Sequence, residues 1–308
     1  GLEQGKRWRL LQNLTYCYKE IELNVALTGT DKLSEEIKNK VGSRPVINLN
    51  LGANGNKIEF NNPEAAVKVT IPYNPTAEEL KNPEHIVVWY IDDKGNVKAV
   101  PSGKYDPATQ SVTFKTTHFS HYAISYVVKS FGDTAAYGWA KREIEVLASK
   151  GIIEGTSATT FHPSANITRA DYVTLIVKTL GLNAKVDTNF SDVKATDYYY
   201  EAVGIAKQLG IVNGTGENVF NPKEHITRQD MFTLTARALK AVKLLKEQGT
   251  AQDLAKFTDK GAIASYAVDS LATLVKDGLL EGDGMKVNPL SNATRAETAV
   301  LMYRIYNK

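Results

Sequence analysis

The chain has 308 residues, of which 43% are hydrophobic and 23% charged, a composition typical of folded proteins and large enough for two or more domains. The net charge of +3 is too small, and the basic residues are too scattered, to indicate nucleic acid as the main partner. No apolar run approaches the ~20 residues that span a bilayer, and the single Cys17 excludes an internal disulfide or a multi-cysteine metal site.

Segments rich in β-forming residues occupy the first 128 positions. They are "TYCYKEIELNVAL", "RPVINLNL", "AVKVTIPY", "HIVVWYID", "NVKAVP" and "QSVTFKTT", and several alternate apolar with polar side chains. Turn signals such as "GANGNK", "DDKGN" and "KYDPATQ" separate them, while only "DKLSEEIKNKV" and "TAEELKN" favour helix. This pattern predicts an antiparallel β-sandwich over residues 1–128, which would serve as a spacer or display domain.

The segment "TTHFSHYAISYV" closes this part of the chain. His-Phe-Ser at a strand end resembles the self-cleaving sequence of the domain shared by netrin receptors, ankyrins and death-domain relatives. If the Phe119–Ser120 peptide were strained, it could undergo an N–O acyl shift with Ser120 as nucleophile and His118 as base. The alternative, which we favour, is that the segment is simply a closing strand.

The residues after position 130 consist of three copies of one unit. The copies begin "FGDTAAYGWAKREIEVLASKGIIEGT", "FSDVKATDYYYEAVGIAKQLGIVNGT" and "FTDKGAIASYAVDSLATLVKDGLLEGD". In every copy an aspartate lies 36 residues before an arginine: Asp133 and Arg169, Asp192 and Arg228, Asp259 and Arg295. An aromatic residue, Trp139, Tyr198 or Tyr266, lies 12 residues before a glycine. Similarity at a fixed period of this kind indicates a repeated structural unit.

Each copy has the pattern of a helix, a loop and a second helix. The first helix ends at a glycine, such as Gly151, and the loop is rich in Gly, Ser, Thr and Pro. The second helix begins after a threonine, and the acid three residues later completes a capping box: Thr168 with Asp171, Thr227 with Asp230, Thr294 with Glu297. Two such helices cannot bury their apolar faces alone, so we expect modules at 129–186, 187–250 and 251–308 to pack around a pseudo-threefold axis.

Structural roles could explain most of the repeated residues. The threonine and the acid are sufficiently explained as helix caps. The aspartates at 133, 192 and 259 could cap the first helices, and the three aromatic residues could belong to the core.

The arginine that follows each capping threonine is harder to explain by structure alone. At the first helical position a positive charge opposes the helix dipole, at a cost of about 0.3–1 kcal/mol if it is unpaired. Helix N-termini with free amides attract anions, and a guanidinium can bind a carboxylate through two hydrogen bonds. An acid elsewhere in the chain could neutralise the charge instead. From this chemistry we expect Arg169, Arg228 and Arg295 to bind an anionic ligand beside an aromatic ring that suits a sugar.

The combination F-x-D, an aromatic, G-I-I-x-G and x-P-x-x-x-I-T-R-A-E closely resembles the S-layer homology family, over about residues 131–308. The resemblance implies a helical spindle that anchors exported bacterial proteins to secondary cell-wall polymers, typically glycans bearing pyruvate ketals. It also implies binding grooves between adjacent modules. Carried over to this sequence, the glycan-binding residues are Arg169, Arg228, Arg295, Gly155, Gly214, Gly282, Asp133, Asp192, Asp259, Trp139, Tyr198 and Tyr266.

The chain departs from the family pattern at several positions. Tyrosine replaces tryptophan in two modules, Gln229 interrupts the second motif, and Ala293 replaces isoleucine in the third. The third loop, "GDGMKVNP", is also one residue short. These departures predict that the third groove is weak or silent.

The sequence therefore predicts an α+β multidomain protein, with an antiparallel β-sandwich followed by an all-α pseudo-threefold bundle of three helix–loop–helix modules. We expect a non-enzymatic part of an exported protein, located at the bacterial cell wall or S-layer. It would bind an anionic, pyruvylated polysaccharide, without a cofactor, metal or membrane span. The absence of a signal segment is expected if a longer N-terminal part precedes it. Two alternatives stay open: a protein–protein module of an S-layer lattice, and autoproteolysis at Phe119–Ser120.

Overall fold

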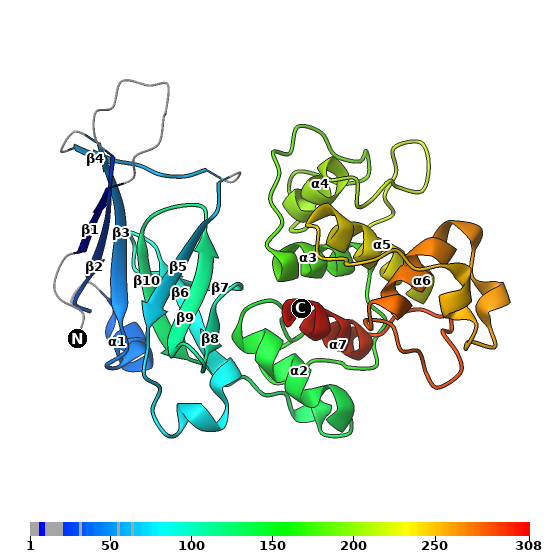
Figure 1. Cartoon of the computed structure of the whole chain (residues 1–308), viewed down its shortest axis with the longest axis horizontal. Coiled ribbons are helices and arrows are strands. Elements are labelled where there is room, and N and C mark those ends of the chain that lie inside the picture. Colours follow the sequence, from blue (N-terminus) through cyan, green and yellow to red (C-terminus); the bar gives the residue numbers. More distant parts are fainter. Residues whose placement is uncertain (1–5, 10–20, 31–32, 54–55, 63–64) are drawn as a thin grey trace. The chain divides into compact units, whose positions relative to one another are not determined.

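A computed structural model of the chain describes residues 6–9, 21–30, 33–53, 56–62 and 65–308. The chain forms two compact units, Gly1–Lys129 with Ala148–Gly151, and Ser130–Leu147 with Ile152–Lys308. The first unit is built mainly of strands and the second of helices, which confirms the predicted order of the two parts (Figure 1). Cys17 and the first residues of the segment "TYCYKEIELNVAL" lie outside the described residues.

Two antiparallel sheets make up the first unit. The larger has the order β1-β2-β3-β10-β6-β7, with β4 paired to β3, and the smaller has the order β5-β9-β8. The strands are β1 (Lys6–Arg9), β2 (Ile21–Leu27), β3 (Val46–Ala53), β4 (Asn56–Ile58), β5 (Val67–Pro72), β6 (Ile86–Ile91), β7 (Val97–Val100), β8 (Lys104–Asp106), β9 (Ser111–Thr116) and β10 (His121–Tyr126). Strand β1 was not predicted, because its sequence KRWR shows no apolar alternation.

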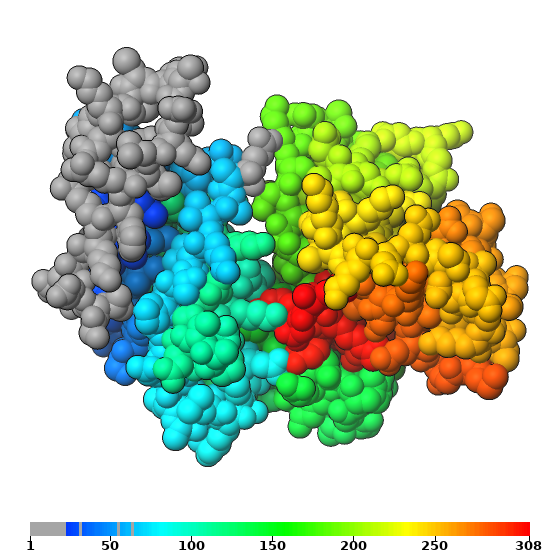
Figure 2. Space-filling view, viewed as in Figure 1, coloured from blue at the N-terminus to red at the C-terminus, as the bar shows by residue number. Residues whose placement is uncertain are grey.

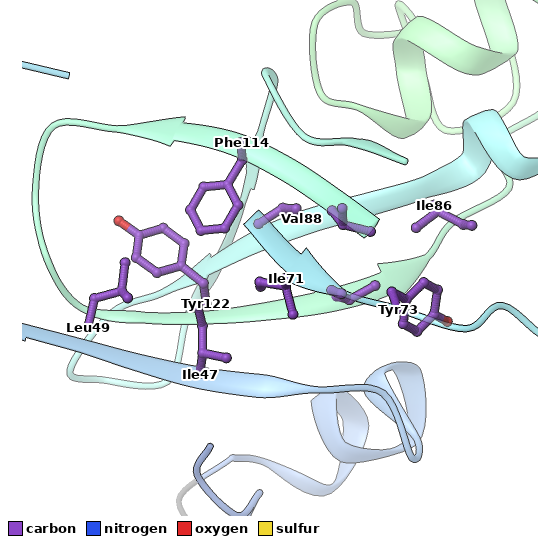
Figure 3. Close-up of a cluster of buried hydrophobic side chains, with 10 residues drawn as sticks. Ile47, Leu49, Ile71, Tyr73, Ile86, Val88, Phe114 and Tyr122 are labelled. Carbon is purple, nitrogen blue, oxygen red and sulfur yellow. The ribbon is translucent and has the colours of Figure 1, made fainter. Parts of the chain in front are cut away.

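The core of the first unit lies between its two sheets. Side chains of β5 and β9 in the small sheet meet those of β3, β6 and β10 in the large one (Figure 3). At the centre the rings of Phe114 and Tyr122 lie 4.9 Å apart, and both are buried. The buried hydroxyl of Tyr122 donates to the carbonyl oxygen of His118 at 2.8 Å, so no polar group is stranded there.

The opposite face of the large sheet is covered by the short helix α1 (Glu35–Val41). Ile37 and Val41 of this helix belong to a second buried cluster with Val87 and Trp89 of β6, whose alternate residues face the other core. Burial on both faces explains why β6 is a continuous apolar run. The second segment expected to be helical forms only a turn of 3-10 helix, η1 (Glu79–Lys81), followed by η2 (Pro83–His85).

The second unit contains three helix pairs, one in each predicted module. The helices are α2 (Gly138–Ser149) and α3 (Arg169–Leu180), α4 (Tyr200–Gln208) and α5 (Arg228–Ala241), and α6 (Val268–Lys276) and α7 (Arg295–Tyr306). Short 3-10 turns lie before some of the first helices: η3 (Gly132–Thr134), η4 (Ala251–Leu254), η5 (Lys260–Ala262) and η6 (Ser265–Ala267). The second helices contact one another, α3 with both α5 and α7, and Figure 2 shows the green, yellow and red segments meeting on one face.

The ends of these helices follow the sequence signals. Gly151, Gly210 and Gly278 end the first helices with φ values of +68°, +68° and +77°, a conformation that favours glycine. The three threonines cap the second helices as predicted. Of these three helices, α7 alone has a complete capping box, in which Glu297 reaches back to the Thr294 amide at 2.8 Å, so the boxes predicted at Thr168 and Thr227 were wrong. The aspartates of the other two modules are one methylene shorter, and their carboxylates bond to the threonine hydroxyl instead.

A closed ring of three backbone hydrogen bonds joins the modules. The amide of Ile167 donates to the carbonyl of Ala293 at 3.0 Å, Ala293 to Ile226 at 2.9 Å, and Ile226 to Ile167 at 3.1 Å. Each of these buried residues directly precedes a capping threonine. A cycle of equivalent bonds requires three copies related by an approximate threefold rotation, so the predicted pseudo-threefold arrangement is confirmed.

Candidate functional site

The repeated residues gather in three sets, each drawing on different modules. Site A combines Arg295, Gly155, Asp133, Asp171 and Tyr198. Site B combines Arg169, Gly214, Asp192, Asp230 and Tyr266. Site C combines Arg228, Gly282, Asp259 and Glu297, and the repeat assigns to it Trp139, the equivalent of the two tyrosines. In every set the arginine comes from one module and reaches the loop of another, because the ring of modules is closed.

The arginines hold the modules together as well as lying at the sites. The Nε atoms of Arg169, Arg228 and Arg295 donate to the carbonyl oxygens of Phe220, Val287 and Phe161, at 3.0, 2.7 and 2.8 Å. Arg295 also donates from Nη2 to the carbonyl oxygen of Glu154 at 2.8 Å. Sequence reasoning did not foresee this structural role, since the bonded carbonyls belong to a different module.

The helix N-termini offer no free amides, and the expectation that they do was wrong. The first two amides of α3, those of Arg169 and Ala170, donate to the carbonyl oxygens of Glu224 and Pro222 in the next module, at 2.8 and 3.0 Å. The first two amides of α5 and of α7 are bonded in the same way. The third amide donates to the capping threonine. Any anion bound here must therefore be held chiefly by side chains.

The aspartates that open each module organise the loops. Asp133 accepts hydrogen bonds from the amides of Phe161 and His162 at 2.9 and 2.7 Å. Asp192 and Asp259 accept the equivalent pairs. Burial acts to raise the pKa of Asp133, but these amide bonds outweigh it and hold the pKa below its ordinary value. The alternative role of capping the first helices was wrong, because these carboxylates are engaged by loop amides.

The loop glycines are required by close packing. A Cβ atom on Gly155 would lie 2.5 Å from Cε1 of Phe131. Gly214 and Gly282 have φ values of +76° and +80°, and a Cβ atom on either would lie 2.6 Å from a backbone oxygen. Their contribution to ligand binding stays a prediction.

The three aromatic residues are exposed, so the alternative that they belong to the core was wrong. Trp139, Tyr198 and Tyr266 are 56%, 72% and 52% exposed. The hydroxyl of Tyr198 donates to Oδ1 of Asp171 at 2.5 Å, and that of Tyr266 to Oδ1 of Asp230 at 2.6 Å. Burial and this hydrogen bond raise the pKa of Tyr266 to about 12. Each tyrosine therefore presents a ring to solvent while its hydroxyl fixes the ring in place.

Site A lines a cleft of about 240 Å³. Its walls include Arg295, Gly155, Asp171, Tyr198 and the cationic Lys178. Burial lowers the pKa of the Arg295 guanidinium, and the nearby carboxylates oppose that effect; an arginine in such surroundings keeps its charge. The cleft thus holds two cationic side chains, the carboxylates of Asp171 and Glu154, and the exposed ring of Tyr198.

The three arginines differ in their charge partners. Arg228 of site C is only 8% exposed, and its Nη1 forms an ion pair with Oε1 of Glu297. Over the described ranges of the chain, neither Arg169 nor Arg295 has a carboxylate within ion-pair distance. Within the described residues, an ion pair with an acid of the chain, which the sequence left open, therefore forms at Arg228 in site C but at neither Arg295 in site A nor Arg169 in site B.

The segment around Ser120 is an ordinary part of the β unit. The Ser120 hydroxyl donates to the carbonyl oxygen of Ile91 at 3.3 Å, and the ring of His118 packs edge-on against Tyr90. Burial lowers the pKa of His118. Neither Phe119 nor Ser120 has a positive φ, and the described backbone contains no cis peptide bond. The φ angles give no sign of backbone strain at the Phe119–Ser120 bond, which favours a closing strand, and self-cleavage there stays a prediction.

Two further features bear on the class of the protein. No cluster of three His, Cys, Asp or Glu side chains suited to a metal ion occurs among the residues that the structure describes. In the same part of the chain, every helix is too short or too polar to cross a bilayer.

Comparison with known proteins identifies relatives of both parts of the chain. Residues 130–173, 189–232 and 256–299 each match the family model of the S-layer homology domain. The amylopullulanase of Thermoanaerobacterium thermosulfurigenes is 31% identical over 94% of this chain, which covers 15% of that protein. The exoglucanase XynX of Acetivibrio thermocellus is 36% identical over 55% of this chain and 16% of its own length. The surface-layer 125 kDa protein of Lysinibacillus sphaericus is 30% identical over 54% of this chain and 14% of its own length.

Proposed function

Because the chain carries three S-layer homology domains in tandem, we propose that it anchors a bacterial surface protein to the cell wall by binding an anionic polysaccharide. Proteins with these domains are located at the cell surface, and S-layer proteins are among the relatives. The observation that carries the proposal is the arrangement in sites A and B. There, an arginine that forms no ion pair within the described residues lies beside an exposed tyrosine and a loop whose amides bond to an aspartate.

The ligand that suits these sites best is a glycan bearing a pyruvate ketal. The ketal adds one carboxylate to a sugar ring, and a guanidinium binds a carboxylate through two parallel hydrogen bonds. The C–H face of the sugar can pack against the exposed ring of Tyr198 or Tyr266. Since each site holds one carboxylate, affinity should fall only modestly with added salt, unlike that of a protein for a polyanion.

The chain matches only a small part of each of these relatives. The chain covers 14–16% of the three relatives described above, which include enzymes that act on glycans and a surface-layer protein. We propose that this chain is the anchoring part of a longer protein, that it has no catalytic role of its own, and that the β unit is a spacer.

Titration calorimetry of the full chain tests the proposal. The probe is a methyl glycoside of N-acetylmannosamine carrying a 4,6-pyruvate ketal, compared with the same glycoside without the ketal. We expect binding only of the ketal form, and at least a tenfold loss of affinity in the double variant Arg169→Ala/Arg295→Ala. Lys276→Ala is the control, because it removes a cation from an exposed ion pair with Glu247 outside the three sites. Absence of binding, or binding that the double variant leaves unchanged, would favour a lattice-assembly role instead.

A further inference from the structure

The acid that caps each second helix uses its two carboxylate oxygens differently. One oxygen accepts a hydrogen bond from the capping threonine hydroxyl. These bonds measure 2.7 Å at Asp171, 2.8 Å at Asp230 and 2.9 Å at Glu297. This contact is the same in all three modules, so it fixes the carboxylate at the start of the helix. The second oxygen is left to bond within the site.

The partner of that second oxygen depends on the aromatic residue of the site. In sites A and B it accepts a hydrogen bond from a tyrosine hydroxyl, that of Tyr198 or Tyr266. In site C the equivalent aromatic residue is Trp139, which has no hydroxyl. There the second oxygen of Glu297 accepts from Nη1 of Arg228 instead.

The length of the acid decides whether it reaches the arginine. Asp171 lies near enough to Arg295 to affect its pKa, yet the two form no ion pair. Glu297 is one methylene longer, and it pairs with Arg228 across two modules. The aspartate held by a tyrosine thus forms no ion pair with the arginine of its site, whereas the longer glutamate does.

We propose that Glu297 is an internal ligand that closes site C, so that the chain binds two anionic glycans and not three. This inference depends on the proposed function of the other two sites. A ligand carboxylate would have to displace Glu297 from Arg228, which is buried. In sites A and B the equivalent aspartate is held by a tyrosine hydroxyl, so no ion pair has to break before a ligand carboxylate reaches the arginine.

The stoichiometry of binding tests this inference. With the pyruvylated glycoside described above, calorimetry should give two equivalents for the unaltered chain. The double variant Glu297→Asp/Trp139→Tyr recreates the residues of sites A and B and should bind three. It should also fold, because aspartate already caps the same helix position at Asp171 and Asp230. Glu247→Asp, in an exposed ion pair, is the matched control and should leave two. Three equivalents in the unaltered chain, or two in a folded double variant, would overturn the inference.

A second measurement needs no glycan, so it separates this inference from the proposed function. Phenylglyoxal labelling followed by peptide mass spectrometry compares the accessibility of the three guanidinium groups. Arg169 and Arg295 should react at least fivefold faster than Arg228 in the unaltered chain, and Glu297→Asp should remove most of that difference. Equal labelling of all three arginines in the unaltered chain would show that Glu297 protects nothing. If labelling follows expectation while no glycan binds, only the proposed function fails.

Discussion

The guanidinium of Arg169 lies over the ring of Phe220, with Cζ 5.0 Å from the ring centre, while its Nε donates to the carbonyl oxygen of the same residue at 3.0 Å. The two residues belong to different modules, so one side chain ties the first module to the loop of the second. Its Nη atoms have no hydrogen bond within the described part of the chain. Arg169 therefore has a structural role in addition to the ligand binding proposed for it, and a substitution can separate the two.

The variant Arg169→Lys keeps the charge but should be unable to contact the Phe220 carbonyl and bind the ligand carboxylate through two hydrogen bonds at the same time. A lysine has one nitrogen and cannot bond to the Phe220 carbonyl while it binds a carboxylate through two parallel bonds. In an Arg295→Ala background, which leaves site B to be measured, we expect the Kd for the pyruvylated glycoside to rise at least about tenfold. Calorimetry gives the affinity and thermal unfolding the stability. An unchanged Kd would mean that charge alone holds the ligand.

The parts of the fold that the sequence predicted are those set by local chemistry. Gly151 ends a helix because of its own φ, and Thr168 caps one through a residue three positions away. Strand β1 could not be predicted in this way. Its residues Lys6–Arg9 carry charge without alternation, and they are a strand because they pair with β2.

The candidate site was predictable in its residue types but not in its partners. In the repeat, Arg169 and Asp133 belong to the same module. In the structure, Arg169 bonds instead to Phe220 in the loop of the second module, whose amide bonds to Asp192. Only the closed ring of modules decides which loop receives which arginine. The same closure brings Glu297 to Arg228, 69 residues away in sequence, so the sequence could show the longer acid but not its ion pair.

Substitution of Gly155 should show that the loop tolerates no side chain. A Cβ atom there would lie 2.5 Å from both Cε1 of Phe131 and the carbonyl oxygen of Ser157. Gly155→Ala should therefore lower the free energy of unfolding by about 1–3 kcal/mol, as overpacking commonly does. Gly138→Ala is the matched control, because α2 begins there and, apart from its chain neighbours and its own helix backbone, no atom lies within 4 Å of the added methyl group. Denaturant unfolding compares the two; equal effects would contradict the packing argument.

The loop aspartates predict an acid-sensitive helical unit. Burial acts to raise the pKa of Asp133 and Asp259. The hydrogen bonds that both carboxylates accept from loop amides have the larger effect and lower both pKa values. A carboxylate whose pKa falls on folding adds stability that is present above its unfolded pKa, ~4, and is lost as the pH falls through its folded value. The Tm of the chain should therefore decrease once the pH falls below about 4.

The variant Asp133→Asn provides the comparison for this pH effect. At neutral pH it should cost about 1–3 kcal/mol, because a loop amide loses its charged acceptor. That cost should shrink as the pH falls, since the unaltered carboxylate is then protonated as well. Asp269→Asn is the control, because this carboxylate accepts no hydrogen bond within the described residues. Thermal unfolding between pH 7 and 3 gives the result, and a cost that stays constant with pH would contradict it.

In the β unit, Tyr122→Phe should be costly even though it removes a single oxygen. The hydroxyl is buried, lies 2.6 Å from Oγ1 of Thr116 and donates to the carbonyl oxygen of His118. Its loss leaves buried polar groups with fewer partners, which should lower the free energy of unfolding by about 1–3 kcal/mol. Tyr126→Phe is the control, since that half-buried side chain has no hydroxyl hydrogen bond in the described part of the chain, and it should change the free energy little. If both variants unfold at the same denaturant concentration, the hydroxyl network does not stabilise the sandwich, and the apolar contact with Phe114 alone carries this end of the core.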